Sequence, residues 1–200
     1  RRTLALAQQL YVGVEISGEG SVGLITYMRT DSLRISDEAM AAAKELIQSR
    51  YGSDYVPATP RRYKAKEGAQ DAHEAIRPSN IQLIPEEIRG DLSAEQYRLY
   101  RLIWSRFMAS QMANAVYDSI SVEVDSAGHE FRCSSSHVKF SGYTAVYEES
   151  RDDEKEEKAR PLPPLEQGDA LTLERFDQEQ HFTQPPARYT EASLIRTMEE

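Results

Sequence analysis

Residues 23–32 (GLITYMRTDS) bring together side chains that could take part in phosphate chemistry. Tyr27 and Arg29 are two positions apart, and in an extended segment this spacing points both side chains to the same face. A guanidinium beside a phenol favours the nucleophilic phenolate, and it can also bind a phosphate through two hydrogen bonds. The chain has 11 tyrosines, however, and on spacing alone a packed tyrosine beside a surface arginine is the favoured interpretation.

A second cluster of polar side chains lies in residues 69–79 (AQDAHEAIRPS). His73 and Arg77 are four positions apart, so on one helical turn they would share a face, and Pro78 would end that turn. A histidine paired with an arginine suits an anionic phosphate. The plainer alternative, which the residues alone favour, is a short capped helix whose histidine is satisfied by a neighbouring carboxylate.

The sequence predicts no metal ligand. His73 and the adjacent Glu74 would diverge on a helix, and the other three histidines lie in the second half of the chain. The single cysteine, Cys133, excludes an internal disulfide and a zinc site built on paired cysteines, which favours a reducing compartment such as the cytoplasm. No apolar run approaches the roughly 18 residues of a membrane-spanning helix, so we expect no membrane partner.

The elements expected around these clusters differ between the two halves of the chain. In the first half, Ser36 is a helix N-cap and Gly52 a stop signal, and Ser93 with Gln96 has the spacing of a capping box before a long amphipathic helix. Residues 4–11 form a third helical segment. The first half is therefore expected to be mostly helical.

After Asn114 the apolar residues recur every second position, which is typical of strands. Ile120, Val122 and Val124 alternate with polar residues, and a turn at 126–128 predicts a hairpin. Further short strands are expected at Val138 and Phe140, at residues 143–147, and at Leu171 and Leu173. Thr190 is expected to cap a final helix. These patterns predict an α+β chain with a helical part followed by a small antiparallel β part.

The net charge of −9 argues at first against a nucleic-acid partner, because polyanion binding usually leaves a basic surplus. The charge is uneven: residues 1–113 hold 15 Lys and Arg against 14 Asp and Glu, and residues 114–200 hold 9 against 19. Much of the acidic excess lies in residues 148–157, which are expected to form a solvated loop. The nearly neutral first half can therefore still gather positive potential at a site.

Three motifs together carry a resemblance to a known family. The string GLITYMRTDS is preceded by AQQLY and is followed about 40 residues later by AHEAIRPS. This arrangement closely resembles the cleavage core of the type IA family, that of bacterial DNA topoisomerase I. The stretch HFTQPPARYTEASLIRTMEE at the end of the chain is also similar to that family. The resemblance spans essentially the whole chain.

The resemblance implies that Tyr27 attacks a backbone phosphodiester of single-stranded DNA, leaving a 5′-phosphotyrosine and a free 3′-hydroxyl. Religation then needs no ATP, and passage of a strand through the break relaxes negative supercoils. It also implies that Arg29 stabilises charge at the scissile phosphate. The residues expected to support the site or contact DNA are Gln8, Thr26, Thr30, Asp31, His73 and Arg77. The family often has a glutamate where this sequence has Val12, so the resemblance implies no role for Val12.

The resemblance further implies a division of the chain and its place in a larger enzyme. Residues 1–113 would form a helical gate domain bearing the tyrosine, 114–186 an antiparallel β hinge domain, and 187–200 the start of a further helical domain. A Toprim domain outside this segment would hold Mg²⁺, so the segment is expected not to cleave DNA alone. The implied partners are single-stranded and negatively supercoiled DNA, with the enzyme in the cytoplasm at the nucleoid.

Three alternatives remain at this stage. One is a binding or structural module without chemistry, in which the strand that carries Tyr27 only packs against the core. A second, a tyrosine recombinase, is disfavoured because its tyrosine follows the arginine and histidine, whereas Tyr27 precedes His73 and Arg77. A third comprises the sister families with the same chemistry, topoisomerase III and reverse gyrase, whose distinguishing parts lie outside this segment.

Overall fold

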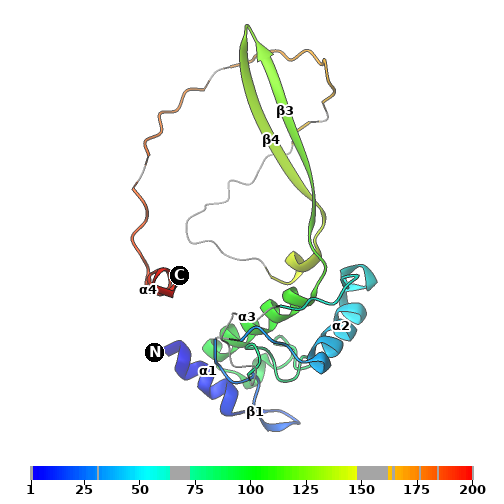
Figure 1. Cartoon of the computed structure of the whole chain (residues 1–200), viewed down its shortest axis with the longest axis vertical. Coiled ribbons are helices and arrows are strands. Elements are labelled where there is room, and N and C mark those ends of the chain that lie inside the picture. Colours follow the sequence, from blue (N-terminus) through cyan, green and yellow to red (C-terminus); the bar gives the residue numbers. More distant parts are fainter. Residues whose placement is uncertain are drawn as a thin grey trace. The chain divides into compact units, whose positions relative to one another are not determined.

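The chain divides into two compact units in the computed structural model (Figure 1). The first unit comprises Arg1–Asp118 and His137–Glu149, and the second comprises Ser119–Ser136 and Ser150–Glu200. The structure describes residues 2–30, 32–63, 73–147, 162–163, 165–175, 177–183 and 185–199. The acidic segment 148–157 lies outside this range, so its expected loop stays a prediction, as do the domain boundaries near residues 113 and 186.

The first unit combines helices with a small β-hairpin. Its helices are α1 (Arg2–Val12), α2 (Asp37–Tyr51) and α3 (Ala94–Gln111), and its short 3₁₀ turns are η1 (Ser53–Tyr55), η2 (Arg89–Asp91) and η3 (Gly142–Ala145). Between α1 and α2, strands β1 (Val14–Ile16) and β2 (Gly20–Val22) pair antiparallel, with Val14 opposite Val22. The α+β class expected from the sequence is confirmed.

The predicted helix ends in the first unit are confirmed. The Ser36 hydroxyl accepts a hydrogen bond from the Ala39 amide, and Gly52, which follows α2, has a φ of 103° that favours glycine. Before α3, Ser93 and Gln96 make both hydrogen bonds of a capping box. These signals are local, which is why the sequence alone predicted them.

One side of α3 forms the centre of the core that supports residues 23–30, the tyrosine segment. Tyr100, Trp104 and Met108 are buried there, together with Leu10 of α1 and Leu24 of the tyrosine segment. The two large aromatic side chains satisfy their polar atoms on loop carbonyls: the Tyr100 hydroxyl donates to Leu83 at 2.6 Å and the Trp104 indole to Ile81 at 3.0 Å. The core therefore anchors both α1 and the tyrosine segment.

The β part of the chain has fewer strands than the sequence suggested. Strands β3 (Val116–Ser126) and β4 (His129–Phe140) form a two-stranded sheet, and Val138 and Phe140 belong to β4 itself. The strand expected at 143–147 is wrong, because the chain there forms η3. The strand expected at Leu171 and Leu173 is also wrong, since both lie exposed in irregular chain.

A close backbone contact explains why the chain turns after β4. Gly142 has a φ of 50°, and a side chain there would collide with the Asn114 backbone. The Tyr143 amide donates to the Ala113 carbonyl at 2.9 Å, and the Tyr55 hydroxyl lies 2.8 Å from the Ser141 hydroxyl. These contacts hold the chain against the end of α3 rather than in an extended strand.

The final helix, α4 (Glu191–Glu199), belongs to the second unit. Its expected cap is confirmed, since the Thr190 hydroxyl accepts a hydrogen bond from the Ser193 amide at 3.2 Å. Across the described part of the chain, no helix combines the length and apolar character needed to cross a membrane.

Candidate functional site

Tyr27 lies at the end of a short backbone pairing between two distant segments. Ile25 forms an isolated antiparallel bridge with Pro78, the Thr26 amide donates to the Arg77 carbonyl at 2.9 Å, and the Ser79 amide donates to the Leu24 carbonyl at 3.0 Å. Leu24 and Ile25 are buried, whereas the Tyr27 side chain is 50% exposed. The chain therefore leaves the core just before Tyr27 and presents the phenol to solvent.

The backbone between Tyr27 and Arg29 turns instead of running straight. The Arg29 amide donates to the Tyr27 carbonyl at 2.9 Å, a hydrogen bond across a single residue that defines a γ-turn. The segment is therefore not extended between Tyr27 and Arg29, which was the condition for placing both side chains on one face. Both residues are exposed, and the role of Arg29 at a phosphate stays a prediction.

Two aromatic side chains from other segments flank the Tyr27 ring. The ring of Tyr11, at the end of α1, meets it edge to face with 5.4 Å between centroids and 67° between planes. The His73 ring lies on a third segment, 5.9 Å away and tilted by 38°. The structure thus brings Tyr27 and His73 together as predicted residues of one site. It adds Tyr11, which no spacing rule could connect to a tyrosine 16 positions later.

The helical turn expected at His73 and Arg77 is absent, because residues 73–77 are irregular. Thr26 accounts for this difference: its hydroxyl donates to the Ala75 carbonyl at 2.8 Å and accepts from the Arg77 amide at 2.9 Å. Backbone groups that a helix would pair locally are thus paired with a residue about 50 positions away. Thr26 was expected to support the site, and its contacts are with the segment that carries His73.

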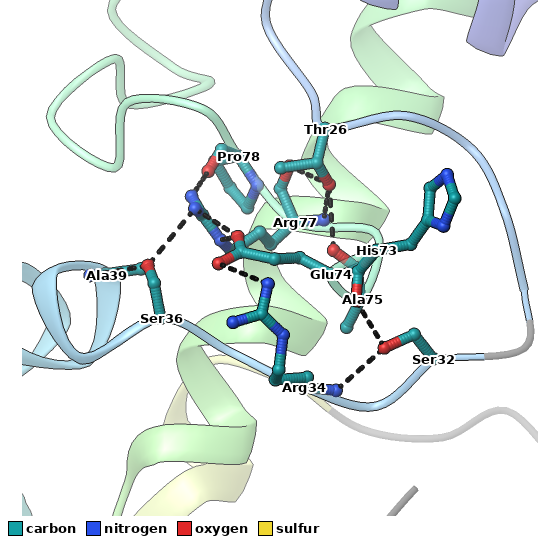
Figure 2. Close-up of polar contacts among 10 residues, drawn as sticks. All are labelled: Thr26, Ser32, Arg34, Ser36, Ala39, His73, Glu74, Ala75, Arg77 and Pro78. Atoms are coloured by element: carbon teal, nitrogen blue, oxygen red, sulfur yellow. Dashed lines mark hydrogen bonds and ion pairs between the residues drawn. The ribbon is translucent and has the colours of Figure 1, made fainter. Parts of the chain in front are cut away.

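Figure 2 shows that the His73 ring points away from the polar contacts around Arg77. Among the described residues, His73 takes part in that network through its backbone carbonyl, which accepts a hydrogen bond from the Ser32 hydroxyl at 2.7 Å. Its ring atom Nδ1 is buried and has no hydrogen-bond partner in the described part of the chain. The imidazole is therefore separated from Arg77, rather than paired with it on one face.

The Arg77 guanidinium is held by protein groups on three of its nitrogens. Nε and Nη2 donate to one carboxylate oxygen of Glu74 at 2.9 and 2.5 Å, and Nη1 donates to the Pro78 carbonyl at 2.8 Å. Nη2 also lies 3.5 Å from the hydroxyl of Ser36, the cap of α2. The Arg77 and Glu74 side chains are only 14% and 18% exposed, so a DNA phosphate would have to compete with a mostly buried ion pair.

Ser32 supports the site, although it is not one of the site residues predicted from the sequence. It is buried, and besides its bond to His73 its hydroxyl accepts from the Arg34 amide at 3.2 Å. The Ala75 amide in turn donates to the Arg34 carbonyl at 2.8 Å. No local signal identifies such a serine, because its burial depends on a segment 41 residues away.

The remaining predicted residues are Gln8, Thr30 and Asp31. Gln8 is exposed on α1, three positions before Tyr11 and so on the same side of the helix. Thr30 is exposed, and Asp31 lies outside the described residues. Among the residues that the structure describes, no group of three or more His, Cys, Asp or Glu side chains could hold a metal ion.

Comparisons with known proteins place these features in a wider context. A sequence model of a family described as DNA topoisomerase matches residues 1–200. The chain is also similar to the solved structure of full-length topoisomerase I from Thermotoga maritima, with a TM-score of 0.72 and 34% sequence identity. That match covers 98% of this chain but 30% of the other chain, so this chain spans less than a third of the length of that relative.

Proposed function

Since the chain belongs to the bacterial type IA DNA topoisomerase family, we propose that Tyr27 is the nucleophile with which the full-length enzyme transiently cleaves single-stranded DNA. The observation that carries this proposal is the half-exposed Tyr27 phenol at the edge of a buried, hydrogen-bonded segment. A nucleophile must reach its substrate while its backbone stays fixed, and both conditions are met at this position.

The proposed reaction is a reversible exchange of one phosphate ester for another. The Tyr27 phenol oxygen attacks the phosphorus, the bond from phosphorus to the 3′ oxygen breaks, and the phenol proton is balanced by the proton that the leaving 3′ oxygen gains. The products are a 5′-phosphotyrosine and a 3′-hydroxyl. Because the ester bond is exchanged and not hydrolysed, the 3′-hydroxyl can reverse the reaction without ATP after another strand has passed.

The neighbouring side chains suit distinct parts of this reaction. Arg29 is exposed two residues after the nucleophile and carries the permanent positive charge that a pentavalent phosphate needs. The His73 ring lies against the Tyr27 ring and faces away from the Arg77 ion pair. In this proposal the imidazole contacts the DNA backbone. Thr26 and Arg77 act as supports, since the hydrogen bonds between them join the two segments of the site.

Other parts of the full-length enzyme complete the proposed function. Among the described residues, no group of three or more His, Cys, Asp or Glu side chains could hold a divalent ion, and we assign Mg²⁺ to a Toprim domain outside this chain. The β part would act as a hinge that moves the tyrosine domain away from Toprim. The substrate is single-stranded or negatively supercoiled DNA, and the place of action is the bacterial nucleoid in the cytoplasm.

Covalent trapping of DNA tests this function. The full-length enzyme is incubated with a labelled single-stranded oligonucleotide and Mg²⁺, then denatured, and the labelled protein is counted. Tyr27→Phe should abolish the adduct because it removes only the attacking oxygen. Tyr117→Phe is the matched control, since Tyr117 on β3 is 51% exposed, close to the value for Tyr27. An adduct that persists in Tyr27→Phe would show that another residue is the nucleophile and would remove the assignment.

A further inference from the structure

We propose that Tyr11 is a positioning residue that orients the Tyr27 phenol for attack, an inference that rests on the function proposed above. Within the described residues, the Tyr27 hydroxyl has no hydrogen-bond partner, and the Tyr27 ring contacts the rings of Tyr11 and His73. Tyr11 supplies the nearer of the two ring contacts, at 5.4 Å against 5.9 Å for His73.

The geometry of the Tyr11 contact is directional. An interplanar angle of 67° points the positively polarised edge of one ring at the negatively polarised face of the other, and this arrangement is favoured over face-to-face stacking. Such a contact restricts rotation of the Tyr27 ring more than simple apolar packing does. A phenol whose ring is held in one orientation loses less freedom when it aligns with a phosphorus atom.

The backbone ties Tyr11 to the same segment that carries Tyr27. The Leu24 amide donates to the Leu10 carbonyl at 2.7 Å, and both of these side chains are fully buried. Gly23 allows the approach, because a Cβ there would lie 2.7 Å from the Tyr11 carbonyl oxygen. The end of α1 (Leu10 and Tyr11) and the start of the tyrosine segment (Gly23 and Leu24) therefore form one closely packed corner, which carries the rings of Tyr11 and Tyr27.

Exposure of Tyr11 also fits a role outside the core. Tyr11 is 39% exposed, so it contributes less to burial than Tyr100 of α3, which is fully buried. Loss of the ring should consequently affect orientation of Tyr27 more than folding. An aromatic ring next to single-stranded DNA could instead stack on a base, and that alternative predicts a change in DNA affinity.

The test measures the single-turnover rate of oligonucleotide cleavage by the full-length enzyme over a range of DNA concentrations. Tyr11→Ala and Tyr11→Leu should each lower the rate at saturating DNA by about tenfold or more, with half-saturation unchanged. Tyr11→Phe should keep the rate, because it retains the ring and its edge. Tyr11→Leu preserves apolar volume and decides the matter if Tyr11→Ala fails to fold.

Each other outcome overturns the inference in a recognisable way. A normal saturating rate in Tyr11→Leu would show that the ring does not orient Tyr27. A weaker half-saturation with an unchanged saturating rate would assign Tyr11 to DNA binding. A Tyr11→Phe variant as slow as Tyr11→Leu would assign the effect to the hydroxyl. If Tyr27→Phe still forms the adduct, the proposed nucleophile fails and the Tyr11 role with it, whereas the other outcomes leave the nucleophile intact.

Discussion

Thr26 and Arg77 are joined by hydrogen bonds that involve the backbones of both residues and the Thr26 hydroxyl. The Thr26 amide donates to the Arg77 carbonyl, the Arg77 amide donates to the Thr26 hydroxyl, and each distance is 2.9 Å. The residue directly before the proposed nucleophile is thereby fixed to the segment that carries His73. This link explains how two motifs that are far apart in the sequence share one site, and it can be tested by substitution.

Thr26→Val should destabilise the fold. The isosteric side chain leaves the Arg77 amide and the Ala75 carbonyl without their partner, at a cost of roughly 1–3 kcal/mol in the free energy of unfolding. Urea unfolding monitored by circular dichroism measures the loss. Thr26→Ser keeps the hydroxyl and should recover most of it, and equal stability of the valine and wild-type chains would contradict this account.

The ion pair between Glu74 and Arg77 should show strong coupling. Removing one partner leaves the other charge mostly buried and costs about 1–3 kcal/mol, whereas removing both recovers part of that loss. A double-mutant cycle with Glu74→Gln and Arg77→Met measures the coupling. The exposed pair of Glu86 and Arg101, at 3.3 Å, provides a control cycle whose coupling should stay below about 1 kcal/mol. Similar coupling in both cycles would contradict the importance of burial.

Gly23→Ala should destabilise the corner between α1 and the tyrosine segment. The new Cβ would lie 2.7 Å from the Tyr11 carbonyl oxygen, so the backbone must shift, typically at about 1–3 kcal/mol. Gly90→Ala is a suitable control, because no atom lies within 4 Å of a Cβ placed there. Thermal unfolding of the two variants should therefore differ clearly, and a Gly23→Ala chain as stable as Gly90→Ala would show that the corner is not tight.

The stability of the chain should fall in strongly alkaline solution. Burial raises the pKa of Tyr100 above its ordinary value of about 10, and burial also raises the pKa of Tyr51. Above about pH 10, the unfolded chain loses phenolic protons that the folded chain keeps. The stability contributed by these neutral phenols is therefore lost as the pH rises. Urea unfolding at pH 8 and pH 10.5 measures this slope.

Tyr100→Phe separates the contribution of the buried Tyr100 from that of the partly buried Tyr51. The variant should lose about 1–2 kcal/mol near neutral pH, because the Leu83 carbonyl loses its donor. Its further loss of stability between pH 8 and pH 10.5 should be smaller than that of the wild-type chain. An alkaline slope equal to that of the wild type would show that Tyr100 does not cause it.

Local features were predicted well from the residues themselves. The caps at Ser36 and Ser93 and the hairpin turn after β3 depend on side chains and backbone within a few positions, so their patterns are readable in one dimension. The family resemblance also identified Tyr27 and His73 as site residues, and the structure brings their rings together. Their catalytic roles remain predictions that the trapping experiment tests.

Features that depend on long-range pairing could not be read in the same way. The pattern of His73 and Arg77 fits a helical turn, but the hydroxyl of Thr26 competes for the backbone groups that such a turn would use. The strand pattern at 143–147 fails for a similar reason, since the end of α3 holds that segment in η3. In both cases a partner from a distant part of the chain overrides a weak local preference.

The amino-acid sequence alone was enough to predict the helix boundaries and the α+β class, whereas the choice of Tyr27 as the centre of chemistry came from the family resemblance and stays a prediction. Only folding in three dimensions placed Tyr11 against Tyr27, enclosed Arg77 in an ion pair with Glu74 and turned the His73 ring away from it. The physical reason is that side-chain caps act over three or four residues, whereas ring contacts and buried ion pairs depend on which segments the core brings together.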